Sequence, residues 1–205
     1  MLELKNISFS YQKQLILNDL SLSVEDGEIV ALLGRSGIGK STLLRIIAGL
    51  LMPDDGAIIA DEVDVTAIPP HKRNIGLVFQ NNALFPHLTV RQNIEYGLRR
   101  VGSERSIRNA RVNALLTKMQ ISSLRDRKVD TLSGGEAKRV AVARTLATAP
   151  RVVLLDEPLT GLDPDTYMSV RNDVLLELRS GGTSVIWVTH DEAEAASVAD
   201  RIIRL

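Results

Sequence analysis

A glycine-rich segment between an apolar run and a helix-forming run constrains this chain more than any other feature. Gly34-Arg-Ser-Gly-Ile-Gly39-Lys40-Ser41 follows Glu28–Leu33, which is almost wholly apolar, and precedes Ser41–Leu50, which has a helical pattern. Such an apolar run is typical of a strand buried on both faces of a parallel sheet. Between a strand and a helix, the backbone N–H groups of a glycine turn form a phosphate-binding loop. The segment therefore predicts a nucleoside triphosphate site.

Two side chains of this loop have specific expected roles. Lys40 should reach the outer phosphates, and Ser41 should be a ligand of Mg²⁺. The glycines are needed because a side chain would block the close approach of phosphate and the positive φ angles. The same letters also occur by chance in unrelated sequences. Here the predicted strand before the loop and the predicted helix after it favour the functional interpretation.

A pair of acidic residues follows a second apolar strand. Val152–Asp156 ends in a carboxylate, and Glu157 comes next. In parallel sheets, ligands lie beyond the carboxyl ends of the strands. Asp156 is expected to hold Mg²⁺ through water, and Glu157 to polarise an attacking water as a general base. The alternative is an ordinary acidic loop; the strand and the following Pro158 disfavour it.

A second glycine turn, Leu132-Ser-Gly-Gly-Glu136, precedes another helical pattern. Ser133 is a natural N-cap, and the N–H groups exposed at a helix start attract anions. The loop at Gly34 already provides a phosphate site, so a second one is redundant unless it serves another subunit. From the residues alone, a simple capped helix remains the better interpretation.

Composition narrows the class of protein. The 205 residues include 25 basic and 25 acidic side chains and no cysteine. A net charge of zero gives no general attraction to nucleic acid or to an anionic membrane. The lack of cysteine excludes disulfides and thiolate metal sites. No apolar run approaches the roughly 18 residues of a spanning helix, and the first residues lack a signal-peptide pattern. We expect a cytosolic chain that reaches a membrane only through a partner.

The order of predicted elements indicates a mainly parallel α/β fold with a helical insertion. Short strands are expected within residues 2–33 and at 74–80, and again at 151–156 and 183–189. A helix at 163–179, capped by Asp163, should join the last two strands. Residues 83–149 are expected to be almost entirely helical, with helices at 103–120 and 133–147. Thr89-Val-Arg-Gln92 resembles a capping box, and the helix after it should bury one face, formed by Val90, Ile94 and Leu98.

Several motifs in this order resemble the ATP-binding subunit of an ATP-binding cassette transporter, over essentially the whole chain. The phosphate loop and Val152–Asp156 resemble the two Walker motifs, and Leu132–Glu136 resembles the family signature. The resemblance implies a single domain over 1–205, with a phosphate-loop NTPase core at 1–82 and 150–205. That core would have a mainly parallel sheet and an N-terminal antiparallel β portion. The inserted α-helical subdomain would occupy about 83–149.

The resemblance also implies a set of site residues for ATP and Mg²⁺. The implied catalytic residues are Glu157, His190, Gln80 and Lys40. Nucleotide binding is implied for Tyr11, Gly34, Arg35, Ser36, Gly37, Ile38, Gly39, Lys40, Ser41, Thr42, Ser133, Gly134, Gly135 and Asp163. The implied metal ligands are Ser41, Gln80 and Asp156. Tyr11 would stack on adenine, Gln80 would also link to membrane subunits, and His190 would lie near the γ-phosphate. Taken singly, each also fits an ordinary structural role.

The implied assembly is a head-to-tail dimer, with itself or with a homologous ATPase subunit, that encloses two ATPs. It would sit at the cytoplasmic face of the inner or plasma membrane, on integral permease subunits that dock near Gln80–Leu88. A solute-binding protein would take part indirectly, and nucleic acid would not. Residues 69–80 and 84–97 resemble the importer ATPases for polyamines, ferric iron, sulfate, thiamine and sugars. Those proteins often have a C-terminal regulatory domain, which we expect this chain to lack. Exporters, lipid-handling cassettes and non-transport cassettes are the alternatives.

Two positions depart from the family pattern. Glu136 replaces the usual Gln of the signature and adds negative charge near a partner's triphosphate. We expect a modest effect if its carboxylate points away from the phosphates. Gly161 replaces a small alanine in the dimer-contact loop Gly161-Leu-Asp163, which is a mild change.

Overall fold

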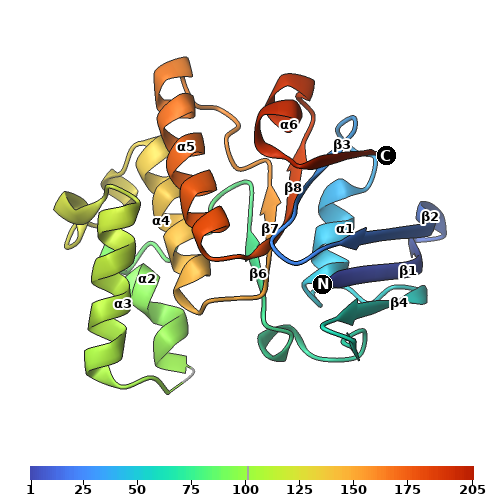
Figure 1. The fold of residues 1–205 in the computed structure, drawn as a ribbon, viewed down its shortest axis with the longest axis horizontal. Helices are drawn as coiled ribbons and strands as arrows, with labels where there is room; N and C mark the ends of the chain where they lie inside the picture. The colour runs from blue at the N-terminus through green and yellow to red at the C-terminus, as the bar shows by residue number, and fades with distance from the viewer. Residues whose placement is uncertain (101) are drawn as a thin grey trace. The chain divides into compact units, whose positions relative to one another are not determined.

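The apolar run before the glycine loop forms β3 (Ile29–Leu33), inside a five-stranded sheet of the computed structural model, which describes residues 1–100 and 102–205. The strand order is β6-β7-β8-β3-β9. The other strands are β6 (Ile75–Val78), β7 (Val152–Asp156), β8 (Ser184–Thr189) and β9 (Arg201–Arg204). Strand β3 pairs in parallel with both β8 and β9, and β7 pairs in parallel with β8. The mainly parallel sheet expected from the sequence is therefore present (Figure 1).

A second, antiparallel sheet is built from the N-terminal part of the chain. Its order is β2-β1-β4-β5. The strands are β1 (Leu2–Tyr11), β2 (Gln14–Val24), β4 (Asp55–Ala60) and the short β5 (Val63–Asp64). This sheet is the expected N-terminal antiparallel portion.

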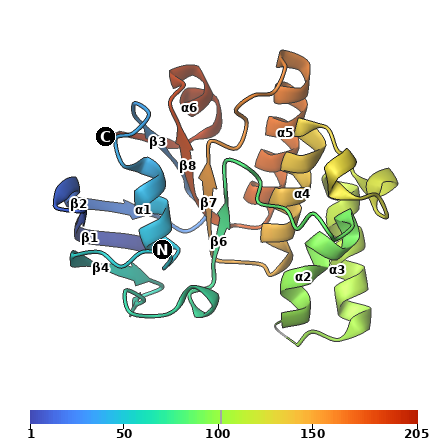
Figure 2. The ribbon, with the colours of Figure 1, turned by 180° about the vertical axis from the view of Figure 1, so that it is seen from behind.

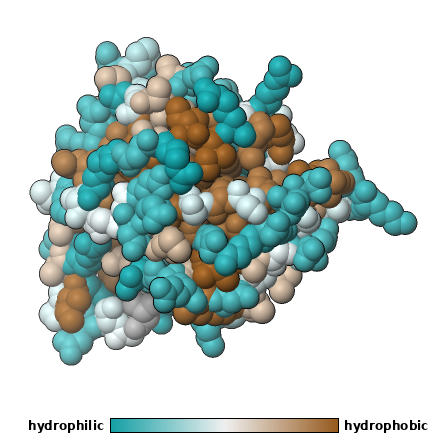
Figure 3. All heavy atoms as spheres, turned by 45° about the vertical axis from the view of Figure 1, so that its right-hand side comes forward, coloured by the Kyte–Doolittle hydropathy of each residue, from teal (hydrophilic) through white to brown (hydrophobic). Residues whose placement is uncertain are grey.

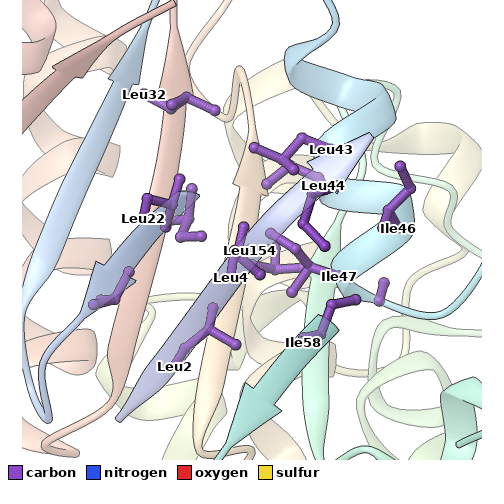
Figure 4. Packing of buried hydrophobic residues seen from close by; sticks show 14 of the residues in the cluster. Leu2, Leu4, Leu22, Leu32, Leu43, Leu44, Ile46, Ile47, Ile58 and Leu154 are labelled. Carbon is purple, nitrogen blue, oxygen red and sulfur yellow. The ribbon is translucent and has the colours of Figure 1, made fainter. Parts of the chain in front are cut away.

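The helix α1 (Lys40–Ile47) supplies the centre of the main hydrophobic core. Figure 4 shows its apolar side chains directed toward those of β1, β4 and β7. The labelled residues, all buried, are Leu2, Leu4, Leu22, Leu32, Leu43, Leu44, Ile46, Ile47, Ile58 and Leu154. Because side chains alternate along a strand, Ala31 and Leu33 of β3 face the other way. They pack with Ala195 of α6 (Glu192–Val198). Both faces of β3 are thus covered, as its sequence predicted.

Four helices belong to the other part of the chain: α2 (Val90–Arg100), α3 (Arg105–Lys118), α4 (Gly134–Ala147) and α5 (Pro164–Ser180). Figure 2 shows α2 and α3 side by side, as Figure 1 does. The expected capping box is present: the N–H of Thr89 donates to Gln92 Oε1 at 2.9 Å, and the N–H of Gln92 donates to Thr89 Oγ1 at 3.3 Å. Val90, Ile94 and Leu98 are buried on one face, as predicted.

The compact units differ from the expected segments. One unit comprises Met1–Leu77, Arg151–Glu157 and Gly182–Leu205, and the other Val78–Pro150 and Pro158–Gly181. The sequence placed residues 158–181 with the core because α5 lies between two core strands. The first turn of α5, however, packs on the start of α4: a Cβ on Gly135 would meet Thr166 Cγ2 at 2.4 Å.

The expectation that residues 83–149 are almost entirely helical was wrong. The segment before α2 has no helix, and only short 3₁₀ turns, η2 (Ser122–Leu124) and η3 (Val129–Thr131), lie between α3 and α4. Another 3₁₀ turn, η1 (Pro70–Lys72), precedes β6. Long-range hydrogen bonds hold the irregular chain between η2 and η3 against the start of α2. The N–H of Arg91 donates to Arg125 O at 2.9 Å, and the N–H of Val90 donates to Arg127 O at 3.0 Å. Sequence periodicity carries no signal for such long-range bonds.

No helix among the described residues has the length and apolar character needed to cross a membrane. Hydrophobic side chains do reach the surface. Figure 3, which brings the side of β1, β2 and β4 forward, shows brown residues interrupted by teal ones. Scattered exposure of this kind is usual for folded proteins.

The end of α1 is held by a buried arginine. Arg73 is 5% exposed, and its guanidinium donates to the carbonyls of Ile46 and Ile47, both at 3.0 Å. It also donates to the carbonyls of Ile68 at 2.7 Å and Thr66 at 2.6 Å. Burial lowers the pKa of Arg73 from its usual value. One cation therefore satisfies carbonyls that the helix end leaves unpaired.

We predict that Arg73→Met lowers the free energy of unfolding by about 3 kcal/mol, because two buried and two partly buried carbonyls lose their donor. Urea denaturation followed by circular dichroism measures this change. Arg151→Met is the matched control. The Arg151 side chain is 68% exposed and pairs with Asp61 at 3.1 Å, so its loss should cost less than about 1 kcal/mol. Equal effects of the two substitutions would contradict the assignment.

Candidate functional site

Three neighbouring parallel strands bring the predicted groups of the first unit to one edge. The phosphate loop follows β3, Asp156 ends β7, and His190 follows β8. The register pairs Leu33 with Thr189 and Asp156 with Val188. Since these strands are parallel and adjacent, their carboxyl ends lie together, where α/β sheets bind ligands. A cavity of about 700 Å³ opens beside the loop, lined in part by Gly34, Arg35, Ser36 and His190.

The backbone of the loop has the conformation that its glycines allow. Gly37 and Gly39 have φ values of 85° and 108°. A Cβ on Gly39 would also come within 3.0 Å of the Leu17 side chain. The helix α1 begins at Lys40, whose ammonium donates to the carbonyls of Gly34 at 2.6 Å and Arg35 at 3.0 Å. The Lys40 side chain therefore binds back to the carbonyls at the beginning of the loop, and the loop backbone leads directly into the first turn of α1.

An oxygen pair lies at the base of the loop. The Ser41 hydroxyl donates to Asp156 Oδ1 at 3.0 Å. Burial raises the pKa of Asp156, the hydrogen bond from Ser41 lowers it, and the neighbouring charge of Glu157 raises it further. A bound cation would offset this burial cost, and Mg²⁺ prefers hydroxyl and carboxylate oxygens. The residues present thus fit the metal that the sequence predicted, with Ser41 and Asp156 as its holders.

The carboxylate of Glu157 lies beside the predicted histidine. Glu157 Oε1 is 3.3 Å from His190 Nδ1. The Glu157 side chain is 13% exposed and that of His190 is 51% exposed. Glu157 has a φ of 45°, in the left-handed region, and its N–H donates to Val188 O at 3.1 Å. Non-glycine residues held in that region are concentrated at functional sites. The backbone is thus held in an uncommon conformation at the residue expected to act as the base.

Sequence reasoning missed a buried residue that fixes the segment before His190. Glu194, 8% exposed, accepts hydrogen bonds from Trp187 Nε1 and Thr189 Oγ1, both at 2.8 Å. Burial raises the pKa of Glu194 despite these bonds. Asp191 caps α6 by accepting from the Glu194 N–H at 2.8 Å. The spacing from Asp191 to Glu194 is that of a capping box and could have revealed the residue.

Tyr11 occupies the end of β1. It is 42% exposed, and in the described part of the chain its ring contact is with Phe9, edge-on at 4.8 Å between centroids. Its ring is thus available to a flat ligand. Thr42, which is also implied for nucleotide binding, lies in the first turn of α1 and is partly buried.

In the second unit, the second glycine turn forms a complete capping box. The N–H of Glu136 donates to Ser133 Oγ at 3.3 Å, and Glu136 Oε2 accepts from the Ser133 N–H at 2.7 Å. Together the two bonds form a capping box at the start of α4. The carboxylate of Glu136 is therefore turned toward its own helix start. Within the described residues, the N–H groups of Gly134 and Gly135 have no acceptor, so they remain available to an anion.

Asp163 is the N-cap of α5, as predicted. Its Oδ1 accepts from the Thr166 N–H at 3.0 Å, and hydrogen bonds to Thr166 lower its pKa. The same loop lies against the second glycine turn. A Cβ on Gly134 would be 3.6 Å from Leu162 Cδ2, so these two predicted segments are neighbours in the folded unit.

Gln80 is exposed and lies just after β6, at the start of the irregular segment before α2. That segment is held by two residues that sequence reasoning missed. Asn93, fully buried, accepts from the Phe85 N–H at 2.9 Å and donates to Phe85 O at 3.2 Å. Arg144 donates to the carbonyls of Ala83 and Asn82, and its guanidinium lies 5.3 Å from the Phe85 ring centroid. No motif identifies either residue in a single sequence.

Comparisons with known proteins fit this geometry. Residues 17–160 match the family described as ABC transporter. The chain is 41% identical, over 203 residues, to the maltose/maltodextrin import ATP-binding protein MalK of Salmonella typhimurium, covering 99% of this chain and 55% of that protein. It is 42% identical, over 205 residues, to the spermidine/putrescine import ATP-binding protein PotA of Haemophilus influenzae, covering 100% of this chain and 55% of that one. The chain thus spans about half the length of these relatives.

A solved structure supports the same relationship. It is a dimeric ATP-binding cassette in a post-hydrolysis state, bound to ADP and Pi. The TM-score is 0.87 at 32% identity, and the match covers 100% of this chain and 94% of that chain. Fold, motifs and family match agree over most of the sequence, and this chain therefore belongs to the ABC transporter family.

Proposed function

We propose that this chain is an ATP-hydrolysing subunit that dimerises around two ATP molecules and drives solute import through partner membrane subunits. The observation that carries the proposal is the edge where β3, β7 and β8 end. There the phosphate loop lies with the Ser41–Asp156 pair and the Glu157–His190 pair. The family match and the names of the relatives, both import ATP-binding proteins, support the direction of transport.

The loop would bind the triphosphate through its backbone N–H groups and the start of α1. The Lys40 ammonium would give up its hydrogen bonds to the carbonyls of Gly34 and Arg35 and would bind the outer phosphates instead. Ser41 and Asp156 would hold Mg²⁺, which supplies charge neutralisation for the transferred phosphoryl group. Gln80 would also contact Mg²⁺ and the attacking water. Tyr11 would stack on adenine.

Glu157 would take the proton of the attacking water as a general base. His190, 3.3 Å from its carboxylate, would orient Glu157 and contact the γ-phosphate. Glu194 fixes Thr189, so it would position His190 without touching the substrate. These residues act on a phosphoryl group passing in line from the leaving ADP oxygen to water.

The second glycine turn would serve the other copy of the dimer. The N–H groups of Gly134 and Gly135, with the Ser133 hydroxyl, would bind the γ-phosphate held by the partner's loop. Asp163 would contact the partner across the same interface. A second anion site would be redundant within one subunit, whereas a head-to-tail dimer would use both glycine turns. ATP would then stabilise the closed dimer, and hydrolysis would release it.

The segment Gln80–Leu88 would dock the membrane subunits. Its attachment to α2 through Asn93 and to α4 through Arg144 would couple a docked partner to both helices. The chain would then sit at the cytoplasmic face of the membrane, held by its permease. A solute-binding protein would deliver the solute to that permease.

We predict that Glu157→Gln binds ATP but hydrolyses it about a hundredfold more slowly or worse, because the general base is lost. With ATP and Mg²⁺, this variant should accumulate as a dimer. Phosphate release and size-exclusion chromatography with light scattering measure the two properties. Lys40→Ala is the contrasting variant: it should fail to bind nucleotide and stay monomeric.

Either of two results would overturn this assignment. Normal turnover by Glu157→Gln would remove Glu157 as the base. Retained nucleotide binding and turnover by Lys40→Ala would remove the loop as the triphosphate site.

We predict that Glu136→Gln leaves ATPase activity within about threefold, because Gln at this position closes the same capping box. Glu136→Ala cannot accept the hydrogen bond from the Ser133 N–H, so it should destabilise the start of α4 by about 1 kcal/mol. Steady-state ATPase assays and thermal unfolding measure the two effects. A large gain in ATP-dependent dimerisation by Glu136→Gln would show instead that the carboxylate repels the partner's triphosphate.

The transport role is tested by affinity capture. We expect tagged Glu157→Gln, with ATP and Mg²⁺, to retain a polytopic membrane protein from its own detergent-solubilised membranes. Lys40→Ala should retain less, because it cannot close. Capture of ribosomal or DNA-repair proteins, or of no membrane protein, would replace transport with a non-transport cassette function.

A further inference from the structure

A cleft of about 510 Å³ in the second unit is lined mainly by charged side chains. They come from α2, from α3 and from the segment between η2 and η3. The charged residues are Arg91, Glu95, Arg99, Arg105, Arg108 and Asp126. None of them belongs to the groups proposed above for ATP, Mg²⁺ or dimer contacts, so the cleft calls for a separate explanation.

Three of the four arginines are fixed in place. The carboxylate of Glu95 accepts from Arg99 Nη2 at 2.9 Å and from Arg108 Nε at 3.0 Å. Glu95 is 4% exposed, and the hydrogen bond from Arg99 lowers its pKa. Arg91 donates from Nη2 to Asn109 Oδ1 at 2.6 Å. A solvated arginine on a surface keeps its rotamer freedom, and these side chains have already lost much of theirs.

The charges around the cleft do not balance. Four guanidinium groups face two carboxylates, and Glu95 is already shared by Arg99 and Arg108. The partner of Arg91 is a neutral amide. Among the described residues, Arg105 and Asp126 form no hydrogen bond or ion pair through their side chains. The cleft therefore keeps an excess of positive charge and unused N–H donors.

We propose that this cleft binds a small organic anion through a phosphate or a carboxylate group. Guanidinium groups recognise both groups through paired N–H donors. Within the described residues, Arg105 has all of its side-chain N–H donors unused, and Arg91 is paired only with a neutral amide. Arg99, in contrast, is paired with Glu95. Arg91 and Arg105 are therefore the primary contacts. The volume exceeds that of a lone phosphate, so a carbon body fits beside the charged group. All residues of this cleft lie in one compact unit, so the inference does not depend on the ATPase proposal.

Arginine side-chain NMR tests this inference directly. Protein labelled with ¹⁵N-arginine is titrated with inorganic phosphate and, separately, with citrate. We expect the Nε–H signals of Arg91 and Arg105 to shift and saturate with at least one probe. Arg35 in the phosphate loop reports binding at that loop separately, so the two sites are not confused. If only phosphate gives saturating shifts, the natural ligand is an organic phosphate. If only citrate does, the natural ligand is a carboxylate.

Three variants make the test specific. Arg105→Gln should weaken binding about tenfold, as loss of a charged hydrogen bond does. Asp126→Asn should tighten binding, because a like charge is removed. Arg127→Gln is the matched control, since Arg127 is exposed and does not line the cleft. Uniform shifts that never saturate, or equal effects of Arg105→Gln and Arg127→Gln, would overturn the proposal.

Discussion

The parallel pairing of β7, β8 and β3 is the constraint on which the rest of the first unit depends. Each strand ends in, or is followed by, a residue group of the site, and the register sets those groups level with one another. A slip of one strand by a single residue would turn its buried side chains to the wrong face. It would also separate Asp156 from Ser41. The chemistry at this edge and the burial of the sheet are therefore specified by the same hydrogen bonds.

Burial around that edge also sets the electrostatics. Asp156 and Glu194 have raised pKa values because both are largely removed from water. The two carboxylates differ in what offsets this cost. Glu194, on α6, accepts hydrogen bonds from two side chains of β8, which makes it a structural part of the site. Asp156 has one donor, from Ser41, and keeps coordination capacity for a cation.

Much of this site was predictable because its signals are local. A glycine loop between strand and helix, an acidic pair at a strand end and a serine before a glycine turn each act over a few residues. They correctly indicated β3, α1, β7, α4 and the N-caps Ser133 and Asp163. The resemblance to transporter ATPases added the family, which the comparisons bear out.

The remaining features depend on contacts between distant segments. Arg73 reads as one charge in a basic stretch, yet it is buried against the end of α1. Residues 83–89 were included in the expected helical stretch although Pro86 interrupts them, and hydrogen bonds to Asn93 and Arg144 hold them in an irregular conformation. The association of α5 with the helical unit also depends on the fit of Thr166 against Gly135. The roles of the site residues, including those of Gln80, Tyr11 and the second glycine turn, remain predictions.

The bonds of Asn93 limit which amino acids can occupy that position. Its side chain accepts from one N–H and donates to the carbonyls of Phe85 and Thr89, inside a fully buried space. Aspartate lacks the donors, leucine lacks both kinds of group, and glutamine is one methylene too long. An asparagine at this point of the chain should therefore persist through sequence drift as firmly as a catalytic residue does, although it touches no substrate.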